Sequence, residues 1–543
     1  MKKVLLGNDA VVQGALEAGV DFVSGYPGCP SAEIGDNLGK IAKEKGIYAE
    51  WSTNEKTGLE AAIGASFSGL KSLVNMKSFG INVCADSLLP LAYTGTKAPM
   101  VIFVGDDPSC HSSAQSEQDS RGYAYLFQIP VLDPSDPQEC LDFTKLGFEI
   151  SEKFNIPVIL RSTTRVAHQR MPVEFAEVKN KTKKIGEFIK NPRQFSTMPP
   201  RTMEMKKELL EKLEKIRDFA EKNKINKIIG KKNNKFGIIA SGISYLHVLD
   251  ALETMGLDIP VLKLGFFYPL PEKLISSFIK GKKKILVAEE MNPYLEKEIT
   301  RLAKDSKVEI HGKDLLPEVG ELNADKIVFA LSKILKIKTK LLKIENFKLK
   351  IPRRTARLCE GCPYWYIFPT LKRMAPDAIF TGDIGCNMIA GFSPHNMQDT
   401  LFSMGASIGI AHGVSKSTKQ KTVAMMGDGT FFHSGIAGLI NAVYNKSSPL
   451  MVILDNRITA MTGHQANPGM GKTLIKEETE ELEIEGIARS CGVKHIKVLD
   501  PINIKEFEET IREFLNKEEI SLIVCKRICA LLAKRQKADR HDQ

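Results

Sequence analysis

The sequence contains no long apolar run. Across its 543 residues, no stretch approaches the roughly 18 to 20 consecutive apolar residues that a membrane span requires. The opening residues, MKKVLLGNDAVVQGALEAG, also lack the apolar core and the small-residue cleavage site of a signal peptide. We therefore expect a cytoplasmic protein with no membrane partner.

Features of a nucleic-acid-binding protein are also missing. The formal net charge is +11, but neither a basic face interleaved with aromatic residues nor a zinc-finger spacing accompanies it. The lysines instead crowd into residues 179–193, 224–237 and 338–354. Because these stretches alternate with acidic helical segments, they are typical of solvated linkers, and we expect no nucleic-acid partner.

Cysteines are spread along the chain. There are 10 of them, and a cytosolic chain is not expected to form a disulfide framework. A clustered subset would therefore indicate metal or redox chemistry.

Short strand-like runs alternate with helical segments along most of the chain. This alternation predicts the α/β class, with tandem three-layer units in which helices cover both faces of a parallel sheet. We expect such units over 1–175, 235–342 and 355–535. Residues 176–234 show no strand pattern, and we interpret them as a charged linker with one helix over 203–223.

A Gly-Asp-Gly turn at Gly427, Asp428 and Gly429 follows an apolar strand. A helix from about residue 433 to 444 and a second strand lead from it to Asn456, with 26 residues between Gly429 and Asn456. Because consecutive parallel strands usually lie side by side, Asp428 and Asn456 are expected to meet at the carboxyl edge of the sheet. Glycines let a diphosphate approach the backbone, and Asp and Asn oxygens suit Mg²⁺.

This arrangement resembles the thiamine-diphosphate motif, although an isolated Gly-Asp-Gly turn is as often structural. The resemblance implies that the backbone carbonyl of Ile458 is a third protein ligand of Mg²⁺. It also implies a glutamate that activates the aminopyrimidine ring. Glu50, Glu55 and Glu60 are available in EWSTNEKTGLEAAIGAS, and we choose Glu55 because it follows a strand-like run and opens a small-residue helix. An isolated glutamate of this kind is otherwise a surface charge.

Further motifs extend the resemblance over nearly the whole chain: GYPGCPSAEI, NEKTGLEAAIGAS, SEQDSRGYA, CEGCP, GDIGC and DNRITAMTGHQ. Together they resemble the alpha subunits of indolepyruvate ferredoxin oxidoreductases, within the 2-oxoacid:ferredoxin oxidoreductases. The resemblance implies a pyrimidine-binding domain over 1–175, a transketolase-C-like domain over 235–342 and a diphosphate-binding domain over 355–535. It implies oxidation of a 2-oxo acid with coenzyme A to acyl-CoA, CO₂ and reduced ferredoxin.

The same resemblance implies an iron–sulfur cluster and further partners. Four cysteines stand at the places where the wider group holds a [4Fe–4S] cluster: Cys359, Cys362, Cys386 and Cys529. From the residues alone, a zinc or dithiol site remains open for Cys359, Cys362 and Cys386. Cys529 is preferred to Cys525 only because ICALL resembles a family motif. The expected partners are a small beta-type subunit, ferredoxin, coenzyme A, the 2-oxo acid and a second copy of the chain.

The sequence departs from the family pattern in three places. The family has threonine where this chain has Cys29, and a thiol is a weaker hydrogen-bond donor than a hydroxyl. Binding of the substrate carboxylate would therefore depend more on Arg121, whose guanidinium group can form two parallel hydrogen bonds with a carboxylate. Arg121 could equally be a structural arginine. The CEGCPYW turn carries Glu360 and Tyr364 in place of proline and histidine. The family ordinarily continues past the last strand into a ferredoxin-like domain, which we do not expect here because AKRQKADRHDQ contains no cysteine.

These departures leave two other functions open. One is a thiamine-dependent decarboxylase or carboligase that transfers no electrons. The other is a non-catalytic assembly subunit, which the presence of Glu55, Asp428 and Asn456 disfavours.

Overall fold

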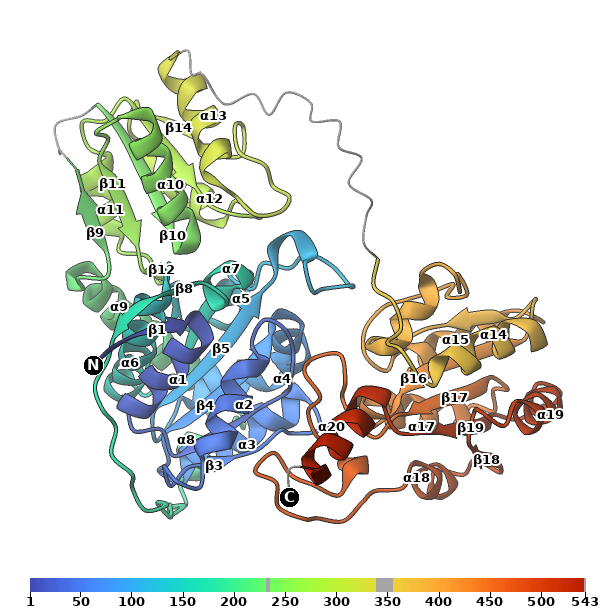
Figure 1. Ribbon diagram of the computed structural model, residues 1–543. Helices are drawn as coiled ribbons and strands as arrows, with labels where there is room; N and C mark the ends of the chain where they lie inside the picture. Colours follow the sequence, from blue (N-terminus) through green and yellow to red (C-terminus); the bar gives the residue numbers. More distant parts are fainter. Residues whose placement is uncertain (231–234, 338–354, 542–543) are drawn as a thin grey trace. The chain divides into compact units, whose positions relative to one another are not determined.

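The computed structural model describes residues 1–230, 235–337 and 355–541. The chain forms two compact units, Met1–Lys348 and Leu349–Gln543 (Figure 1). The lysine-rich linker expected at 338–354 lies outside the described residues, as do 231–234 within the second lysine-rich stretch. None of the helices in the described parts of the chain combines the length and the apolar character that crossing a bilayer requires.

A seven-stranded sheet forms the centre of the first unit. Its strands lie in the order β12 (Phe266–Tyr268), β6 (Val131–Leu132), β7 (Val158–Thr163), β5 (Met100–Asp106), β4 (Ser72–Lys77), β2 (Phe22–Gly25) and β3 (Tyr48–Ala49). All neighbours pair in parallel except β12 and β6. The central strand β5 is buried along its whole length, as expected for a strand covered on both faces.

Two groups of helices pack in this part of the unit. One consists of α1 (Gly7–Glu17), α2 (Ala32–Ile41) and α6 (Pro137–Phe154), and the other of α3 (Glu55–Phe67), α4 (Ser78–Thr94) and α9 (Arg201–Lys222). Short helices lie at α5 (Gly122–Phe127), α7 (Thr164–Ala167) and α8 (Pro192–Phe195). A separate antiparallel pair joins β1 (Lys2–Leu6) to β8 (Arg170–Glu174).

A second sheet of the first unit has the order β14 (Glu309–His311), β13 (Lys284–Ala288), β10 (Phe236–Ser241), β11 (Val261–Leu264) and β9 (Lys227–Ile229). Its helices are α10 (Gly242–Met255), α11 (Glu272–Ile279), α12 (Tyr294–Ala303) and α13 (Ala324–Leu335). The strand β12 leaves this segment and joins the first sheet, so residues 235–342 contribute to both sheets.

The charged segment 176–234 is more structured than expected. Its helix, α9, buries a stripe of apolar residues at helical spacing: Met205, Leu209, Leu213, Ile216 and Ala220. The expectation that the segment holds no strand is wrong, because β9 pairs antiparallel with β11. This strand has only three residues, too few for a periodic pattern to be recognised in the sequence.

The second unit contains a five-stranded sheet in which every pairing is parallel. Its order is β15 (Ile379–Thr381), β16 (Thr422–Gly427), β17 (Leu450–Asp455), β19 (Ser521–Lys526) and β18 (His495–Leu499). The accompanying helices are α14 (Tyr364–Met374), α15 (Ala406–Ser417), α17 (Ile436–Tyr444), α18 (Ile484–Ser490), α19 (Ile504–Phe514) and α20 (Ala530–His541). Two apolar cores lie in this unit. The predicted α/β class with tandem parallel-sheet units is confirmed.

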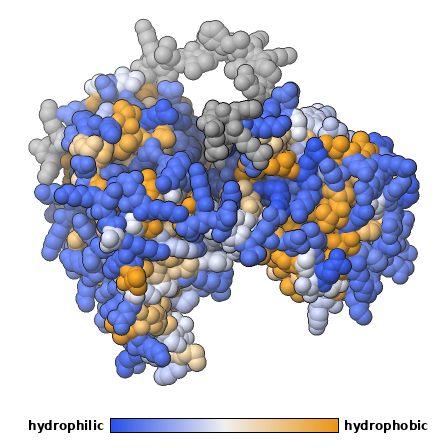
Figure 2. Space-filling view, turned by 60° about the horizontal axis from the view of Figure 1, so that its bottom comes forward, coloured by the Kyte–Doolittle hydropathy of each residue, from blue (hydrophilic) through white to orange (hydrophobic). Residues whose placement is uncertain are grey.

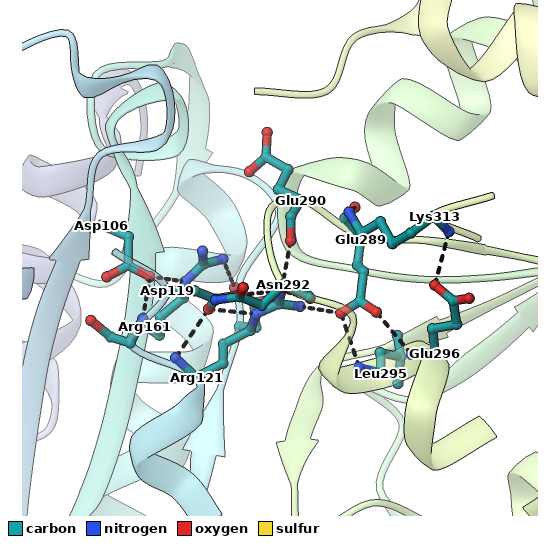
Figure 3. Close-up of polar contacts among 12 residues, drawn as sticks. Asp106, Asp119, Arg121, Arg161, Glu289, Glu290, Asn292, Leu295, Glu296 and Lys313 are labelled. Atoms are coloured by element: carbon teal, nitrogen blue, oxygen red, sulfur yellow. Dashed lines mark hydrogen bonds and ion pairs between the residues drawn. The ribbon is translucent and has the colours of Figure 1, made fainter. Parts of the chain in front are cut away.

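A buried charge cluster connects the two sheets of the first unit (Figure 3). Arg121, only 2% exposed, donates to both carboxylate oxygens of Asp119 and to Glu289 at 2.9 Å. Arg161, at 3% exposure, donates to Asp106 at 2.8 Å and to Asp133 at 3.2 Å. Because Glu289 follows β13 of the second sheet, the cluster fixes one sheet to the other.

Glu290 is the buried carboxyl in this region whose charge is least offset by hydrogen bonds and ion pairs. Its Oε1 accepts a hydrogen bond from the Leu322 amide at 2.9 Å, whereas its Oε2 has no hydrogen-bond partner among the described residues. Burial raises the pKa of Glu290 to about 7, although the positive charge of Arg161 acts in the opposite direction. The neutral acid is therefore favoured in the folded protein.

This pKa predicts how stability responds to pH. Between about pH 4.5 and 7 the native state holds a proton that the unfolded chain releases, so the free energy of unfolding falls by about 3 kcal/mol as the pH rises. We expect Glu290→Gln to remove this contribution and to be more stable than the unmodified protein at pH 8. Urea denaturation midpoints at pH 5 to 8 measure the effect.

The exposed residue Glu318 provides the control variant Glu318→Gln, which should keep the original pH profile. An unchanged profile in Glu290→Gln would show that Glu290 ionises normally.

Candidate active site

Asp428 and Asn456 follow neighbouring parallel strands. In the register of β16 and β17, Gly427 is opposite Leu454, so both polar residues lie just beyond the strand ends. The helix expected from about residue 433 begins earlier: helical backbone starts at Asp428, continues through a π-helical turn at Phe431–Gly435 and becomes α17. The Gly-Asp-Gly turn is therefore itself the first helical turn, which brings orphan backbone N–H groups to the edge of the sheet.

The Asp428 carboxyl is almost fully buried. It accepts hydrogen bonds from the Gly429 amide at 2.9 Å and from Asn467 Nδ2 at 3.0 Å. Burial, together with the nearby carboxylate of Asp455, raises the pKa of Asp428 to about 7. Such a carboxyl is suited to a cation, because a positive charge would offset the cost of its ionisation.

Asn456 is held by two further contacts. Its Oδ1 accepts a hydrogen bond from the Ile458 amide at 3.1 Å, and its Nδ2 donates to the Tyr364 hydroxyl at 3.0 Å. The Ile458 amide also lowers the pKa of Asp428, so both Asp428 and Asn456 interact with the backbone at Ile458. A carboxylate, an amide oxygen and a carbonyl are a donor set that fits Mg²⁺.

The two glycines of the turn differ in their surroundings. A Cβ at Gly429 would lie 2.9 Å from Thr459 Oγ1, whereas a Cβ at Gly427 would meet no atom within 4 Å. The backbone at Gly427 is therefore open to a ligand, and Gly429 is constrained by close packing.

Glu55 is the most buried of the three candidate glutamates, with 7% exposure. It is the first residue of α3, and Gly80 of α4 makes room for it, because a Cβ at Gly80 would lie 2.6 Å from Glu55 Cγ. Glu50 accepts hydrogen bonds from the hydroxyls of Tyr48 and Ser52. Glu60 is exposed and paired with Lys56. The preference for Glu55 agrees with this burial.

Cys29 lies in the turn between β2 and α2 and is partly buried. Burial raises the pKa of its thiol, and the carboxylate of Glu33 raises it further, so the group is a neutral thiol at physiological pH. At the preceding residue, a Cβ added to Gly28 would lie 2.8 Å from the Cβ of Lys77. The turn is therefore packed directly against the end of β4.

Arg121, which is expected to bind the substrate carboxylate, is engaged by protein groups in this structure. Each of its three guanidinium nitrogens already donates to a protein acceptor, and Nη2 also reaches the carbonyl oxygens of Glu290 and Asn292. The structural alternative fits these contacts. The partners at 289–292 lie far away in the sequence, so the motif SEQDSRGYA did not reveal them.

The four predicted cluster cysteines lie in one region of the second unit, where their charges influence one another. Cys359 and Cys362 precede α14, Cys386 begins a 3₁₀ turn after β15, and Cys529 follows β19. Burial raises the pKa of Cys386 to about 12, with further contributions from Cys362, Cys529 and Cys359. Cys525 instead lies in the core, 2% exposed. The described residues contain no group of three or more His, Cys, Asp or Glu side chains that could hold a metal ion.

The cysteine group adjoins the Asp428 edge of the same sheet. The amide of Cys529 donates to the Asn456 carbonyl at 3.0 Å, and the Cys529 sulfur lies 3.9 Å from His464 Nε2. Four thiols, three of them partly buried, form a donor set that fits an iron–sulfur cluster.

Two residues near this edge were missed in the sequence. Asn467 orients Asp428, and Asp383 accepts hydrogen bonds from the amides of Gly405 and Ser407. Burial raises the pKa of Asp383 to about 6. Asp383 belongs to the GDIGC motif, which drew attention only to its cysteine, and the Asn-Pro-Gly turn at residue 467 was the available signal for Asn467.

Three family descriptions match consecutive parts of the chain. Residues 13–222 match the thiamine-diphosphate-binding domain of pyruvate flavodoxin/ferredoxin oxidoreductases. Residues 226–350 match an indolepyruvate oxidoreductase domain. Residues 383–525 match the C-terminal TPP-binding domain of thiamine pyrophosphate enzymes.

Curated relatives match almost from end to end. Indolepyruvate oxidoreductase subunit IorA of Methanothermobacter marburgensis is 44% identical over 97% of this chain and 87% of its own length. The subunit of the same name from Thermococcus kodakarensis is 41% identical, over 97% and 86%. Among solved structures, the match to 2-oxoglutarate:ferredoxin oxidoreductase from Magnetococcus marinus covers 61% of this chain and 65% of that chain at 19% identity, with a TM-score of 0.49. The two sequence relatives confirm the resemblance, and the chain belongs to the family of indolepyruvate oxidoreductase IorA subunits.

Proposed function

We propose that this protein is the thiamine-dependent subunit of an enzyme that oxidises an aryl 2-oxo acid such as indolepyruvate. The products are an acyl-CoA, CO₂ and reduced ferredoxin. The observation that carries the proposal is the placement of Asp428 and Asn456 at the ends of paired strands, in a chain whose relatives are named indolepyruvate oxidoreductase subunits.

The three predicted domains divide this task. Residues 1–175 bind the aminopyrimidine, residues 355–535 bind the diphosphate, and residues 235–342 form the transketolase-C-like domain, with 176–234 as the connecting segment. Asp428, Asn456 and the Ile458 carbonyl hold Mg²⁺, and Gly427 admits the diphosphate to the backbone. When bound there, thiamine diphosphate would supply a carbon nucleophile for the 2-oxo carbon and a sink for the charge left by loss of CO₂.

Glu55 holds the proton at N1′ of the aminopyrimidine. Its burial at the start of α3 supports this role, because a hydrogen bond to a carboxylate is stronger in a site from which water is excluded. The packing of Gly80 against Glu55 limits how far the side chain can move.

Cys359, Cys362, Cys386 and Cys529 hold the [4Fe–4S] cluster that accepts electrons one at a time. The hydrogen bond from the Cys529 amide to the Asn456 carbonyl supports placing the cluster beside the diphosphate site, since one segment of backbone serves both.

The chain works with a small beta-type subunit and with a second copy of itself, and uses ferredoxin and coenzyme A. Apolar side chains on the second unit support a contact with a partner (Figure 2). Phe402, Ile440 and Tyr444 are 61%, 50% and 82% exposed, and large contiguous apolar surfaces of this kind mark interaction sites.

An anaerobic assay of the assembled enzyme tests the proposed function. Indolepyruvate, coenzyme A and ferredoxin should give acyl-CoA and reduced ferredoxin in proportion. Decarboxylation without reduction of ferredoxin would favour a non-oxidative decarboxylase, and the absence of any reaction with 2-oxo acids would favour an assembly subunit.

Glu55→Gln should lower the turnover of the 2-oxo acid by at least about 100-fold, the usual effect of losing a general acid–base group. Binding of thiamine diphosphate, followed by calorimetry, should persist. The exposed Glu60 supplies the control, since Glu60→Gln should retain turnover. Full activity in Glu55→Gln would refute the assignment.

Cys386→Ser should lose most of the iron and acid-labile sulfide that the anaerobically purified protein contains, because one of four thiolate ligands is removed. Cys491→Ser, in the same unit but outside the cysteine group, should keep both. Zinc in place of iron in the unmodified protein would instead establish a zinc site.

A further inference from the structure

Lys77 is a partly buried cation at the carboxyl end of β4. Since β4 lies between β5 and β2, this end is in the middle of the edge at which open parallel sheets bind ligands. Lys77 directly precedes the 17-residue helix α4, whose first N–H groups have no partner within the helix and favour a negative charge. A negatively charged group is therefore favoured next to Lys77.

The Lys77 ammonium has few partners in the protein. It donates to the Ser112 carbonyl at 2.9 Å and lies 5.2 Å from the centre of the Phe79 ring. Within the described chain, Lys77 forms no ion pair with any carboxylate. The neighbouring Asp107 is engaged elsewhere, by hydrogen bonds from Ser112 and Thr164. Burial lowers the pKa of Lys77, and Asp107 opposes that change.

Lys77 lies beside the Cys29 turn, and the helix that follows it contacts Glu55. A Cβ added at Gly28, in the turn that carries Cys29, would lie 2.8 Å from the Cβ of Lys77. Glu55 packs against Gly80, three residues further along the same helix start. The segment formed by the end of β4 and the start of α4 therefore contacts both the Cys29 turn and the proposed acid–base residue.

A partly buried charge without an ion-pair partner is costly, and an anionic ligand would offset that cost. The carboxylate is the charged group that all 2-oxo acids share, and Arg121 is not free to bind it. We propose that Lys77 binds the substrate carboxylate beside Cys29 and thereby selects 2-oxo acids over neutral carbonyl compounds. This inference rests on the proposed function of the site.

The test compares Lys77→Met, Lys77→Arg and the unmodified assembled enzyme, with exposed Lys97→Met as control. Lys77→Met should raise the KM for the 2-oxo acid by about 10- to 100-fold, as expected for losing a hydrogen bond between charged groups. The KM for coenzyme A and the affinity for thiamine diphosphate should not change. Lys77→Arg should recover part of the loss, and Lys97→Met should behave as the unmodified enzyme.

Inhibition adds a measurement that a purely structural role would not alter. The unmodified enzyme should be inhibited more strongly by an unreactive aryl carboxylate than by the matching neutral amide, and Lys77→Met should lose this preference. An unchanged KM and preference, or loss of thiamine diphosphate binding in both Lys77 variants, would overturn the assignment and leave the proposed function standing. An unmodified enzyme that turns over no 2-oxo acid would overturn both.

Discussion

Parallel pairing of neighbouring strands is the constraint on which the proposed site depends. Backbone hydrogen bonds between β16 and β17 set Gly427 opposite Leu454, and the residues that follow, Asp428 and Asn456, emerge at one edge. In the first unit, the same geometry brings the Cys29 turn and the end of β4 to one edge. Because parallel strands need a crossover between them, residues far apart in sequence converge at their carboxyl ends.

The buried charges of the first unit perform a different task from the site residues. Arg121 and Arg161 are surrounded by carboxylates, and removing one partner from such a cluster leaves an uncompensated buried charge. The arrangement connects the segment after β13 to the loop after β5. The cluster orients the second sheet relative to the first. Because Arg121 and Arg161 are paired within it, we assign binding of an anion at the Cys29 turn to Lys77.

In the second unit, a short run of backbone connects the two kinds of chemistry proposed for the site. Asn456 is linked through its side chain to Tyr364 and through its carbonyl to the amide of Cys529. Tyr364 begins α14 directly after the Cys359–Cys362 turn. The bulkier CEGCPYW turn therefore contributes to holding Asn456, so the tyrosine that departs from the family pattern has a structural role here.

The sequence alone predicted the α/β class and the paired placement of Asp428 and Asn456, and it led us to propose four cysteines as cluster ligands. The α/β class follows from the local alternation of strand-like and helical segments. The placement follows because only one helix and one strand separate Asp428 from Asn456, and consecutive parallel strands usually pair. The cysteines followed from resemblance to the family. Tertiary structure alone decided the role of Arg121, whose partner Glu289 lies 168 residues away, and the environment of Lys77. Burial and ion pairing depend on contacts between distant segments, which no local pattern of residues records.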